Sequence, residues 1–319
     1  DILREGAQKG LDSILKATGD SEMVVIVGLP LAVKDRLFNC AAVLQNGKIL
    51  GIVPKTHLPD YNEFYEQRWF TQADQLELSE VELSDGIVPI GRDLIFSSKD
   101  DRNIAFGIEI CEDVWVPVPP SSYMAQAGAL LLFNLSASNE LVGKADYRKG
   151  LVESQSARCV AGYVYASSNC GESSTDMVYG GHLIIAENGH ILHGSERFYF
   201  GNKLASADVD LDRLSFNRLI MGTFRDGRGE LNYRNVYFDT PQKAEFYGKP
   251  LRHTDRYPFV PANDDTRNDR CREILSIQTS GLEKRIRHTG LQRAVIGISG
   301  GLDSTLAFIV AVRAMKRTG

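Results

Sequence analysis

Two Asn-Gly pairs are the features that most constrain the fold of this chain. Asn46-Gly47 and Asn188-Gly189 each lie between two short apolar runs. Asn and Gly accept the left-handed backbone that a two-residue hairpin turn requires, so each pair predicts two antiparallel strands joined by a tight turn. Because parallel strands need long crossover connections instead, a purely parallel doubly wound sheet does not fit this pattern.

Further strands and helices are predicted around the hairpins. Continuous apolar runs, typical of buried strands, occupy residues 23–28, 104–110, 129–135 and 161–166. Helical spacing of apolar residues occupies 1–17, and a second helical stretch at 147–158 precedes the last of these strands. Strands that alternate with helices, with hairpins mixed in, predict an α/β layered sandwich built on a mixed sheet.

A change in sequence character marks a second domain. Across 239–268 prolines recur, charges are dense and no hydrophobic period holds, which predicts a linker. Helical spacing then returns, followed by the short apolar run 294–298, which predicts a strand. We therefore expect one domain at 1–238 and the beginning of another at 269–319. Because the first residue is Asp1 and the last residues continue a helical pattern, we expect the protein to be longer.

Composition narrows the class of protein. With 43% hydrophobic and 24% charged residues the chain has ordinary globular composition, and its net charge of −5 argues against a nucleic-acid binder. No apolar stretch approaches the roughly 18 residues of a membrane span, so no membrane partner is expected. The five cysteines lack paired spacing, which predicts neither disulfides nor a zinc site and is typical of a reducing cytoplasm. They are Cys40, Cys111, Cys159, Cys170 and Cys271.

One cysteine and one lysine each follow a predicted buried strand. Cys111 comes directly after the run 104–110, where a sharp turn would present its sulfur at the sheet edge, as a nucleophile requires. Lys55 follows the apolar run 49–53, and a nearby ammonium favours a thiolate and stabilises an oxyanion. Taken alone, a cysteine in such a place more often only packs, and a lysine between two prolines is more often solvated.

The stretches around these two residues are more specific. PKTHLPDYNEFYEQRWF (54–70) and GIEICEDVWVPVPPS (107–121) resemble the lysine and cysteine signatures of the nitrilase superfamily, in the glutamine amidohydrolase branch attached to NAD⁺ synthetases. NLSASNELVGKADYRKGLVESQSARCVAGYVYASS (134–168) is similar to the same branch. The resemblance implies a nitrilase-type α-β-β-α sandwich with a Glu-Lys-Cys triad. In it Cys111 attacks the side-chain amide of glutamine and Lys55 stabilises the tetrahedral intermediate.

The general base of that triad has no match in this sequence. The resemblance places the base glutamate in a Pro-Glu segment upstream of Asp1, and glutaminase activity is expected to be lost or severely reduced without it. Glu66 resembles a second glutamate of the superfamily, which orients the lysine. Glu109 lies two residues before Cys111 and is expected on the same strand face, but we do not assign it as the base.

The resemblance also implies a pocket for glutamine. Tyr61 and Glu112 would line it, with Ser138 and Lys144 near the α-amino and α-carboxylate groups of the substrate. A cation at position 144 suits a carboxylate. The alternative, a solvated lysine in a Gly-Lys loop, stays open for Lys144.

A glycine-containing loop lies between the strand predicted at 294–298 and a helical run from Thr305 to Lys316. Two glycines let the backbone approach a phosphate, and the amides at the helix start form an anion site. The spacing differs from that of the GxGxxG and GxxxxGK[ST] loops. It resembles the pyrophosphate-binding loop (PP-loop) of a Rossmann-like adenine-nucleotide α-hydrolase domain and implies ATP binding. The loop consists of Ser299, Gly300, Gly301, Leu302, Asp303 and Ser304.

A nitrilase-type glutaminase followed by SGGLDS resembles the glutamine-dependent NAD⁺ synthetases. The resemblance implies that ATP, with Mg²⁺, adenylates nicotinic acid adenine dinucleotide (deamido-NAD), and that ammonia from glutamine then displaces AMP to give NAD⁺. The Mg²⁺ ligands and most of the deamido-NAD site are expected beyond Gly319, so no metal ligands are expected within the chain. Nitrilase domains commonly pair, which implies a homo-oligomer.

Two alternatives remain open from the sequence. A stand-alone nitrilase-type amidase would act on an unrelated amide without ATP and would not need the SGGLDS loop. A non-catalytic assembly module would use the sandwich only as a platform for oligomers. Glutamine-protected labelling of Cys111 by a thiol-directed glutamine analogue separates an active glutaminase from such a scaffold.

Overall fold

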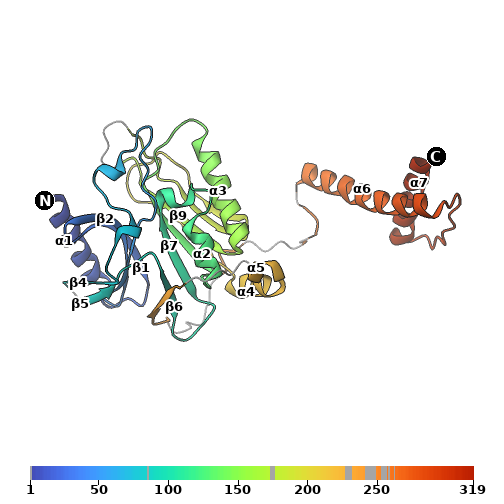
Figure 1. Cartoon of the computed structure of the whole chain (residues 1–319). Coiled ribbons are helices and arrows are strands. Elements are labelled where there is room, and N and C mark those ends of the chain that lie inside the picture. Colours follow the sequence, from blue (N-terminus) through green and yellow to red (C-terminus); the bar gives the residue numbers. More distant parts are fainter. Residues whose placement is uncertain are drawn as a thin grey trace. The chain divides into compact units, whose positions relative to one another are not determined.

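The computed structural model describes residues 2–84, 86–172, 177–226, 232–240, 249–252, 257, 259–261 and 263–319. The chain divides into two compact units, Asp1–Arg252 and His253–Gly319. Figure 1 labels the helices and strands of both units. Helix α6 (Asp264–Thr289) begins inside the segment predicted as a linker. The predicted domain limits stay a prediction.

The first unit contains two large sheets built from described residues. The three-stranded sheet has the order β1-β2-β3 and is antiparallel throughout. The seven-stranded sheet has the order β11-β10-β9-β8-β7-β6-β12 and is mixed, with β7, β8 and β9 parallel. These strands are β1 (Val25–Val33), β2 (Arg36–Gln45), β3 (Lys48–Pro54), β6 (Leu94–Ser98), β7 (Ala105–Ile110), β8 (Leu131–Ser136), β9 (Gly162–Ser167), β10 (Leu183–Glu187), β11 (His190–Gly194) and β12 (Arg234–Phe238). The mixed sheet confirms the predicted fold class.

The turns of both predicted hairpins are present. Asn46 and Gly47 have φ values of 51° and 70°, and Asn188 and Gly189 have 46° and 83°. Positive φ at both central residues gives the turn a twist that matches the twist of the flanking strands, which is why Asn-Gly is favoured there. The first turn joins β2 to β3 and the second joins β10 to β11. A smaller hairpin, β4 (Glu80–Leu83) with β5 (Gly86–Pro89), lies outside the large sheets.

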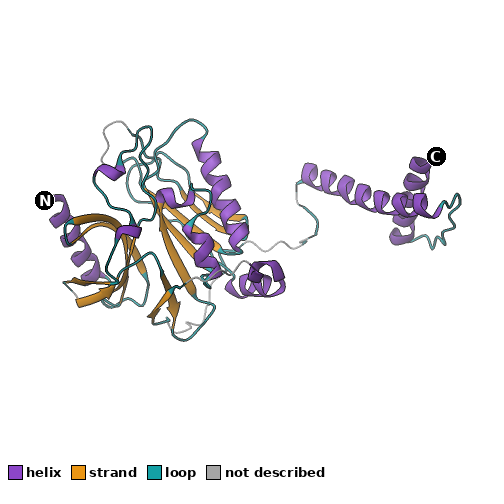
Figure 2. Ribbon diagram, viewed as in Figure 1, coloured by secondary structure: helices purple, strands orange, loops and turns teal. Residues whose placement is uncertain are grey.

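Helices cover the outer faces of the two sheets. Helix α1 (Ile2–Ala17) packs its buried Leu11 and Leu15 against the three-stranded sheet. Helices α2 (Pro120–Gln126) and α3 (Lys144–Cys159) pack on the seven-stranded sheet. The layers are thus α-β-β-α (Figure 2), the nitrilase-type sandwich that the sequence predicts. Two shorter helices, α4 (Leu211–Ile220) and α5 (Gly222–Asp226), follow β11 in the chain.

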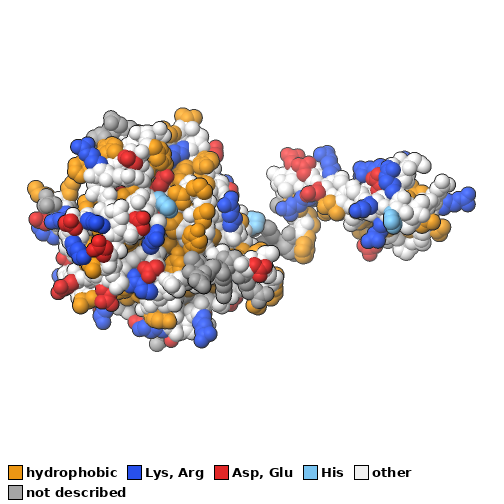
Figure 3. Space-filling model, in the orientation of Figure 1, with side chains coloured by type: hydrophobic (Ala, Val, Ile, Leu, Met, Phe, Trp, Pro, Cys, Tyr) orange, Lys and Arg blue, Asp and Glu red, His pale blue; other side chains and the backbone are white. Residues whose placement is uncertain are grey.

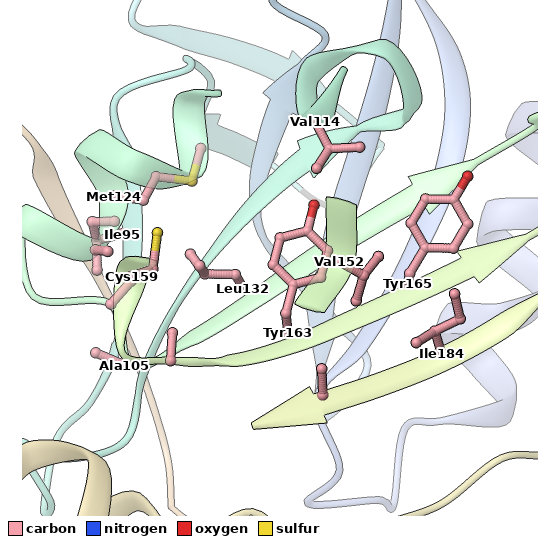
Figure 4. Close-up of a cluster of buried hydrophobic side chains, with 14 residues drawn as sticks. Ile95, Ala105, Val114, Met124, Leu132, Val152, Cys159, Tyr163, Tyr165 and Ile184 are labelled. Carbon is pink, nitrogen blue, oxygen red and sulfur yellow. The ribbon is translucent and has the colours of Figure 1, made fainter. Parts of the chain in front are cut away.

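Apolar side chains fill the space between these layers. Between the sheets, Val43 and Val53 of the smaller sheet meet Phe96, Phe106 and Ile108 of the larger one. Figure 4 shows the buried apolar cluster that includes Met124 of α2, Val152 of α3 and Tyr163 of β9. Burying such side chains contributes about 1.5–3 kcal/mol each relative to exposure. The packing of this core therefore fixes the positions of both sheets, and the sheets in turn position the side chains of the candidate site.

The second unit consists mainly of two packed helices, α6 and α7 (Leu302–Thr318). Residues 294–298 form no strand among the described residues, and Val295 is 99% exposed. A strand exists only where another strand pairs with it, and no described residue pairs with this run. The predicted strand is therefore absent here, although the helix after SGGLDS is present.

The surface is mixed in character. Figure 3 shows acidic, basic and hydrophobic side chains interspersed on the visible face of the first unit. None of the helices formed by the described residues combines the length and apolarity needed to cross a bilayer.

Candidate active site

A cavity of about 710 Å³ lies where β7 and β8 end. Cys111 follows β7, Ser136 ends β8 and Ser167 ends β9, and all three line this cavity. Lys55, which follows β3 of the other sheet, lines it as well. Because the carboxyl ends of neighbouring parallel strands meet at one edge of a sheet, residues far apart in sequence converge here. Cys111 and Lys55 are therefore brought to one site, as their predicted roles require.

Cys111 begins a short turn of 3₁₀-helix, Cys111–Val114, directly after β7. Its φ of 47° lies in the left-handed region, which costs a non-glycine residue free energy and persists only where the surroundings fix it. Asn134 supplies part of that fixation, because its Oδ1 accepts a hydrogen bond from the Cys111 N–H at 3.1 Å. Its Nδ2 lies 3.4 Å from the Cys111 carbonyl oxygen. The turn leaves the thiol partly exposed to the cavity.

Lys55 is buried, with 3% of the residue exposed. Its Nζ forms a short ion pair with Glu66 Oε2, and the other oxygen of Glu66 accepts a hydrogen bond from Asn39 Nδ2 at 2.7 Å. A buried ammonium without a counter-ion would be strongly unfavourable, so Glu66 holds both the charge and the direction of Lys55. This geometry fits the predicted orienting role of Glu66.

Tyr61 and Glu112 are joined directly. The Tyr61 hydroxyl donates to Glu112 Oε1 at 2.8 Å. Burial and this hydrogen bond raise the pKa of Tyr61. Glu112 lines the cavity, and Tyr61 lies at the exposed side of the pair, 50% exposed. The two residues predicted to contact glutamine therefore lie together beside Cys111.

Ser138 lies in the loop that follows β8, and Lys144 is the first residue of α3 after that loop. Ser138 is buried and accepts a hydrogen bond from Arg148 Nη2 at 3.2 Å. Lys144 Nζ bonds to Asn139 Oδ1 and lies over the Phe64 ring, 5.4 Å from its centroid. Burial, and next the positive charge of Arg148, lower the pKa of Lys144. Neither Ser138 nor Lys144 is among the residues that line the cavity in the described chain, whereas their neighbours Ser136 and Ala137 are.

The prediction that Glu109 lies on the same strand face as Cys111 is wrong. The Glu109 carboxylate accepts hydrogen bonds from the Ser121 N–H at 2.9 Å and from the Tyr163 hydroxyl, on the side of α2. Cys111 packs with the cluster on the opposite face of the sheet. The alternation of faces fails because the strand ends at Ile110 and the backbone turns at the positive φ of Cys111.

Three of the carboxylates that line the cavity have side-chain partners. Glu66 pairs with Lys55, Glu112 with Tyr61, and Glu63 with Asn139. These bonds give Glu63, Glu66 and Glu112 other tasks than that of a free base. Among the described residues, no group of three or more His, Cys, Asp or Glu side chains could hold a metal ion.

The SGGLDS loop precedes α7 in the second unit. Gly300 has φ of 84°, a conformation that favours glycine. The Ser299 N–H and Oγ lie 3.3 and 3.2 Å from Ser304 Oγ, and Ser304 Oγ donates to the Gly301 carbonyl at 3.1 Å. These contacts gather two hydroxyls at the N-terminus of a helix, which is a ready-made site for an anion. Leu302 and Asp303 form the first turn of that helix.

Two residues of the site were not predicted from the sequence. Asn134, to which the sequence assigned no role, holds the Cys111 backbone, and the available signal was only a polar residue late in a buried strand. Asp113 is 1% exposed and bonds to the amides of His57, near Lys55, and of Ile110, next to Cys111. The signal for Asp113 was an acidic residue two positions after the candidate nucleophile.

Comparison with known proteins places this geometry in a family. The model of the carbon-nitrogen hydrolase family matches residues 5–218, and that of NAD synthase matches residues 274–318. The glutamine-dependent NAD⁺ synthetase of Mycobacterium leprae is 42% identical over all of this chain and 47% of its own length. The corresponding enzyme of Thermotoga maritima is 27% identical over 99% of this chain and 49% of its own length. The chain thus spans about half the length of the curated relatives it matches.

Solved structures show the same fold. A glutamine-dependent NAD⁺ synthetase from Cytophaga hutchinsonii has a TM-score of 0.53 and 29% identity, over 61% of this chain and 31% of that one. A carbon-nitrogen hydrolase from Helicobacter pylori has a TM-score of 0.54 and 19% identity, over 71% and 75% of the two chains. The resemblance to glutamine-dependent NAD⁺ synthetases that the sequence predicted is therefore confirmed. With a family model that matches more than half of its length, this chain belongs to the carbon-nitrogen hydrolase family.

Proposed function

We propose that the chain is the glutaminase part of a glutamine-dependent NAD⁺ synthetase, followed by the ATP-binding opening of the synthetase part. The glutaminase domain would occupy 1–238, the linker 239–268 and the synthetase segment 269–319. The observation that carries the proposal is the convergence of Cys111, at a positive-φ turn, and the buried Lys55 on one cavity. The relatives supply the second half of the proposal, because they unite both family matches in one chain.

The chemistry begins with the Cys111 thiol, which attacks the side-chain amide carbon of glutamine. A glutamate base, which we place upstream of Asp1, takes the thiol proton and gives it to the departing nitrogen, so that ammonia leaves and a thioester remains. Water then cleaves the thioester to glutamate and the free thiol. The Lys55 ammonium, held by Glu66, donates to the oxyanion of each tetrahedral intermediate.

Substrate recognition would use the residues beside the nucleophile. Tyr61 and Glu112 form the hydrogen-bonded pair at the wall of the cavity. Lys144 provides the cation for the α-carboxylate, and its partners Asn139 and Phe64 hold it in place. Ser138 contributes through the loop that Arg148 fixes.

The second half of the reaction would use the loop 299–304. The Ser299 and Ser304 hydroxyls and the amides at the start of α7 can hold the pyrophosphate portion of ATP. Ammonia would displace AMP from adenylated deamido-NAD and give NAD⁺. The Mg²⁺ ligands are proposed beyond Gly319, as the resemblance to the synthetases implies. A homo-oligomer in the cytoplasm completes the proposal.

The test uses the full-length enzyme with ATP, Mg²⁺ and deamido-NAD. NAD⁺ formation is followed with glutamine or with ammonium as nitrogen source, in wild type, Cys111→Ala and Cys271→Ala. Cys271 lies exposed on α6, so its substitution is a matched control. We expect Cys111→Ala to abolish glutamine-supported synthesis and to keep ammonium-supported synthesis, with Cys271→Ala unchanged. Equal loss with both nitrogen sources would make Cys111 structural. No NAD⁺ from either source in wild type, with ATP-independent hydrolysis of an amide, would make the protein a stand-alone amidase.

A further inference from the structure

Asp113 lies in the turn that follows Cys111 and is almost completely buried. Its Oδ1 accepts a hydrogen bond from the His57 N–H at 2.7 Å. Its Oδ2 accepts one from the Ile110 N–H at 2.9 Å and a longer one from the Thr56 N–H at 3.4 Å. One carboxylate thus holds the backbone directly before Cys111 and the two amides directly after Lys55.

The two segments that Asp113 connects come from different sheets. Lys55 follows β3 of the three-stranded sheet, and Cys111 follows β7 of the seven-stranded sheet. Packing between sheets is set by apolar side chains, which fix a separation but not the direction of a single ammonium. Hydrogen bonds from one buried group to both segments fix their relative position more closely. Asp113 is placed to provide this restraint.

The surroundings of Asp113 keep its charge compatible with this contact. Burial raises the pKa of Asp113 to about 6, while the Ile110 and His57 amides and the Lys55 charge oppose that rise. Glu109 on β7 is the other carboxyl group that interacts with it electrostatically. At neutral pH the group is therefore mainly a carboxylate, whose two oxygens can both accept from amides.

We propose that Asp113 is a positioning residue that fixes the Lys55 ammonium relative to the Cys111 sulfur during glutamine hydrolysis. This inference rests on the proposed glutaminase function. Asp113 acts through the backbone of both segments and does not touch the substrate. Small displacements of catalytic groups lower rates steeply, by on the order of 100-fold for about 1 Å.

Asparagine at position 113 changes the hydrogen-bonding pattern of the side chain but keeps its size. The side chain keeps its size, but one of its two terminal atoms becomes an NH₂ donor. That donor would face either the His57 amide or the Ile110 amide, both of which are donors themselves. One of the two segments must then move. Glutamate keeps the acceptors and the charge but is longer by one methylene, so it shifts the turn instead.

The experiment uses full-length Asp113→Asn and Asp113→Glu. Glutamine-supported and ammonium-supported NAD⁺ formation give kcat and KM, and alkylation by iodoacetamide gives the reactivity of Cys111. For Asp113→Asn we expect glutamine-supported kcat to fall by about 100-fold with KM within about threefold, and alkylation of Cys111 to slow by about tenfold. Ammonium-supported synthesis should stay unchanged. Asp113→Glu should show the same pattern with a kcat loss of roughly tenfold.

Glu187→Gln is the control, because Glu187 is also a buried carboxylate that accepts a backbone hydrogen bond, from the Asp210 N–H at 2.7 Å. It also pairs with Arg252, so this variant tests a loss of stability that is remote from the cavity. It lies at the end of β10 away from the cavity and should leave kcat and alkylation unchanged. Wild-type kcat and alkylation rate in folded Asp113→Asn would overturn the proposal. If that variant does not fold, Asp113→Glu decides in the same way. If wild type hydrolyses no glutamine but Asp113→Asn slows alkylation of Cys111, the positioning role of Asp113 is supported and the proposed glutaminase function is refuted.

Discussion

Asn134 holds the backbone of Cys111 with both ends of its carboxamide. The Cys111 N–H donates to Asn134 Oδ1 at 3.1 Å, and Asn134 Nδ2 donates to the Cys111 carbonyl at 3.4 Å. Ser136 Oγ also donates to Asn134 Oδ1, at 2.6 Å. A short polar side chain of the neighbouring strand β8 therefore stabilises the left-handed backbone of the proposed nucleophile.

Asn134→Ala removes these bonds and leaves the Cys111 amide without its partner. Because an unpaired buried donor costs about 1–3 kcal/mol, we expect the free energy of unfolding in urea to fall by about that amount. Glutamine-supported kcat should fall by roughly 10–100-fold because the thiol is no longer held. Asn169→Ala is the control, since Asn169 follows β9 and its side chain bonds to the backbone of the loop residues Gly171 and Gly201. An equal loss of kcat in both variants would refute the specific role of Asn134.

Glu66→Gln tests the buried ion pair with Lys55. The side chains of Lys55 and Glu66 are 3% and 16% exposed, so neutralising one partner leaves an uncompensated ammonium in a buried site. We expect a loss of about 3 kcal/mol in the free energy of unfolding, measured with urea. The exposed pair of Lys34 with Glu77, 57% and 69% exposed, provides the comparison. Glu77→Gln should cost less than about 1 kcal/mol, and a similar cost for both variants would contradict the argument.

Glu109 gives a prediction about pH. Burial raises its pKa to about 7, above the ordinary value of 4.5, against the hydrogen bonds from Tyr163 and Ser121. The folded state therefore binds more protons than the unfolded state between these values, and stability falls as pH rises through them. The loss from this group is about 3 kcal/mol at most.

Glu109→Gln removes the titrating group and keeps its shape. Urea unfolding of wild type and variant from pH 4.5 to 8 should show wild type losing stability relative to the variant as pH rises, with most of the change below pH 7. The buried Asp113, whose charge interacts with that of Glu109, titrates in both proteins and adds to the slope of both stability curves. Parallel stability curves would mean that Glu109 does not carry a raised pKa.

Gly300→Ala tests the ATP-binding loop. An added Cβ would meet no atom within 4 Å, but the φ of 84° is unfavourable for alanine. We expect the KM for ATP in the full-length enzyme to rise by roughly tenfold, while hydrolysis of glutamine is unchanged. Gly297→Ala, also in open space but without a positive φ, is the control. A KM for ATP at the wild-type value in Gly300→Ala would contradict the assignment of this loop.

The parts of the fold that depend on local sequence could be predicted. The Asn46-Gly47 turn and the long apolar runs carry their own signal, because backbone preference and burial act within a few residues. The strand at 294–298 was wrong for the opposite reason, since a strand depends on a partner elsewhere in the chain. The face of Glu109 was wrong because one left-handed residue, Cys111, breaks the alternation.

In the candidate site, too, the residues with a local sequence signal could be predicted and those that depend on distant contacts could not. Cys111, Lys55 and Glu66 lie in stretches that resemble a family, and the structure brings them to one cavity or one ion pair. Asp113 and Asn134 act by hydrogen bonds to residues that are distant in sequence or belong to another strand. Single-sequence patterns give only a weak signal for such contacts, so the folded arrangement is needed to identify these two residues.

The parallel strands β7, β8 and β9 have a consequence for which parts of this site tolerate substitution. Their ladder fixes Ile110, the residue before Cys111, and Ser136 through backbone bonds, which side-chain substitutions elsewhere leave intact. The loops that carry Tyr61 and Ser138 lie outside this ladder. Substitutions in these loops can therefore change the lining of the cavity while the proposed nucleophile keeps its place. The scaffold thus allows the pocket wall to vary independently of the backbone that precedes Cys111.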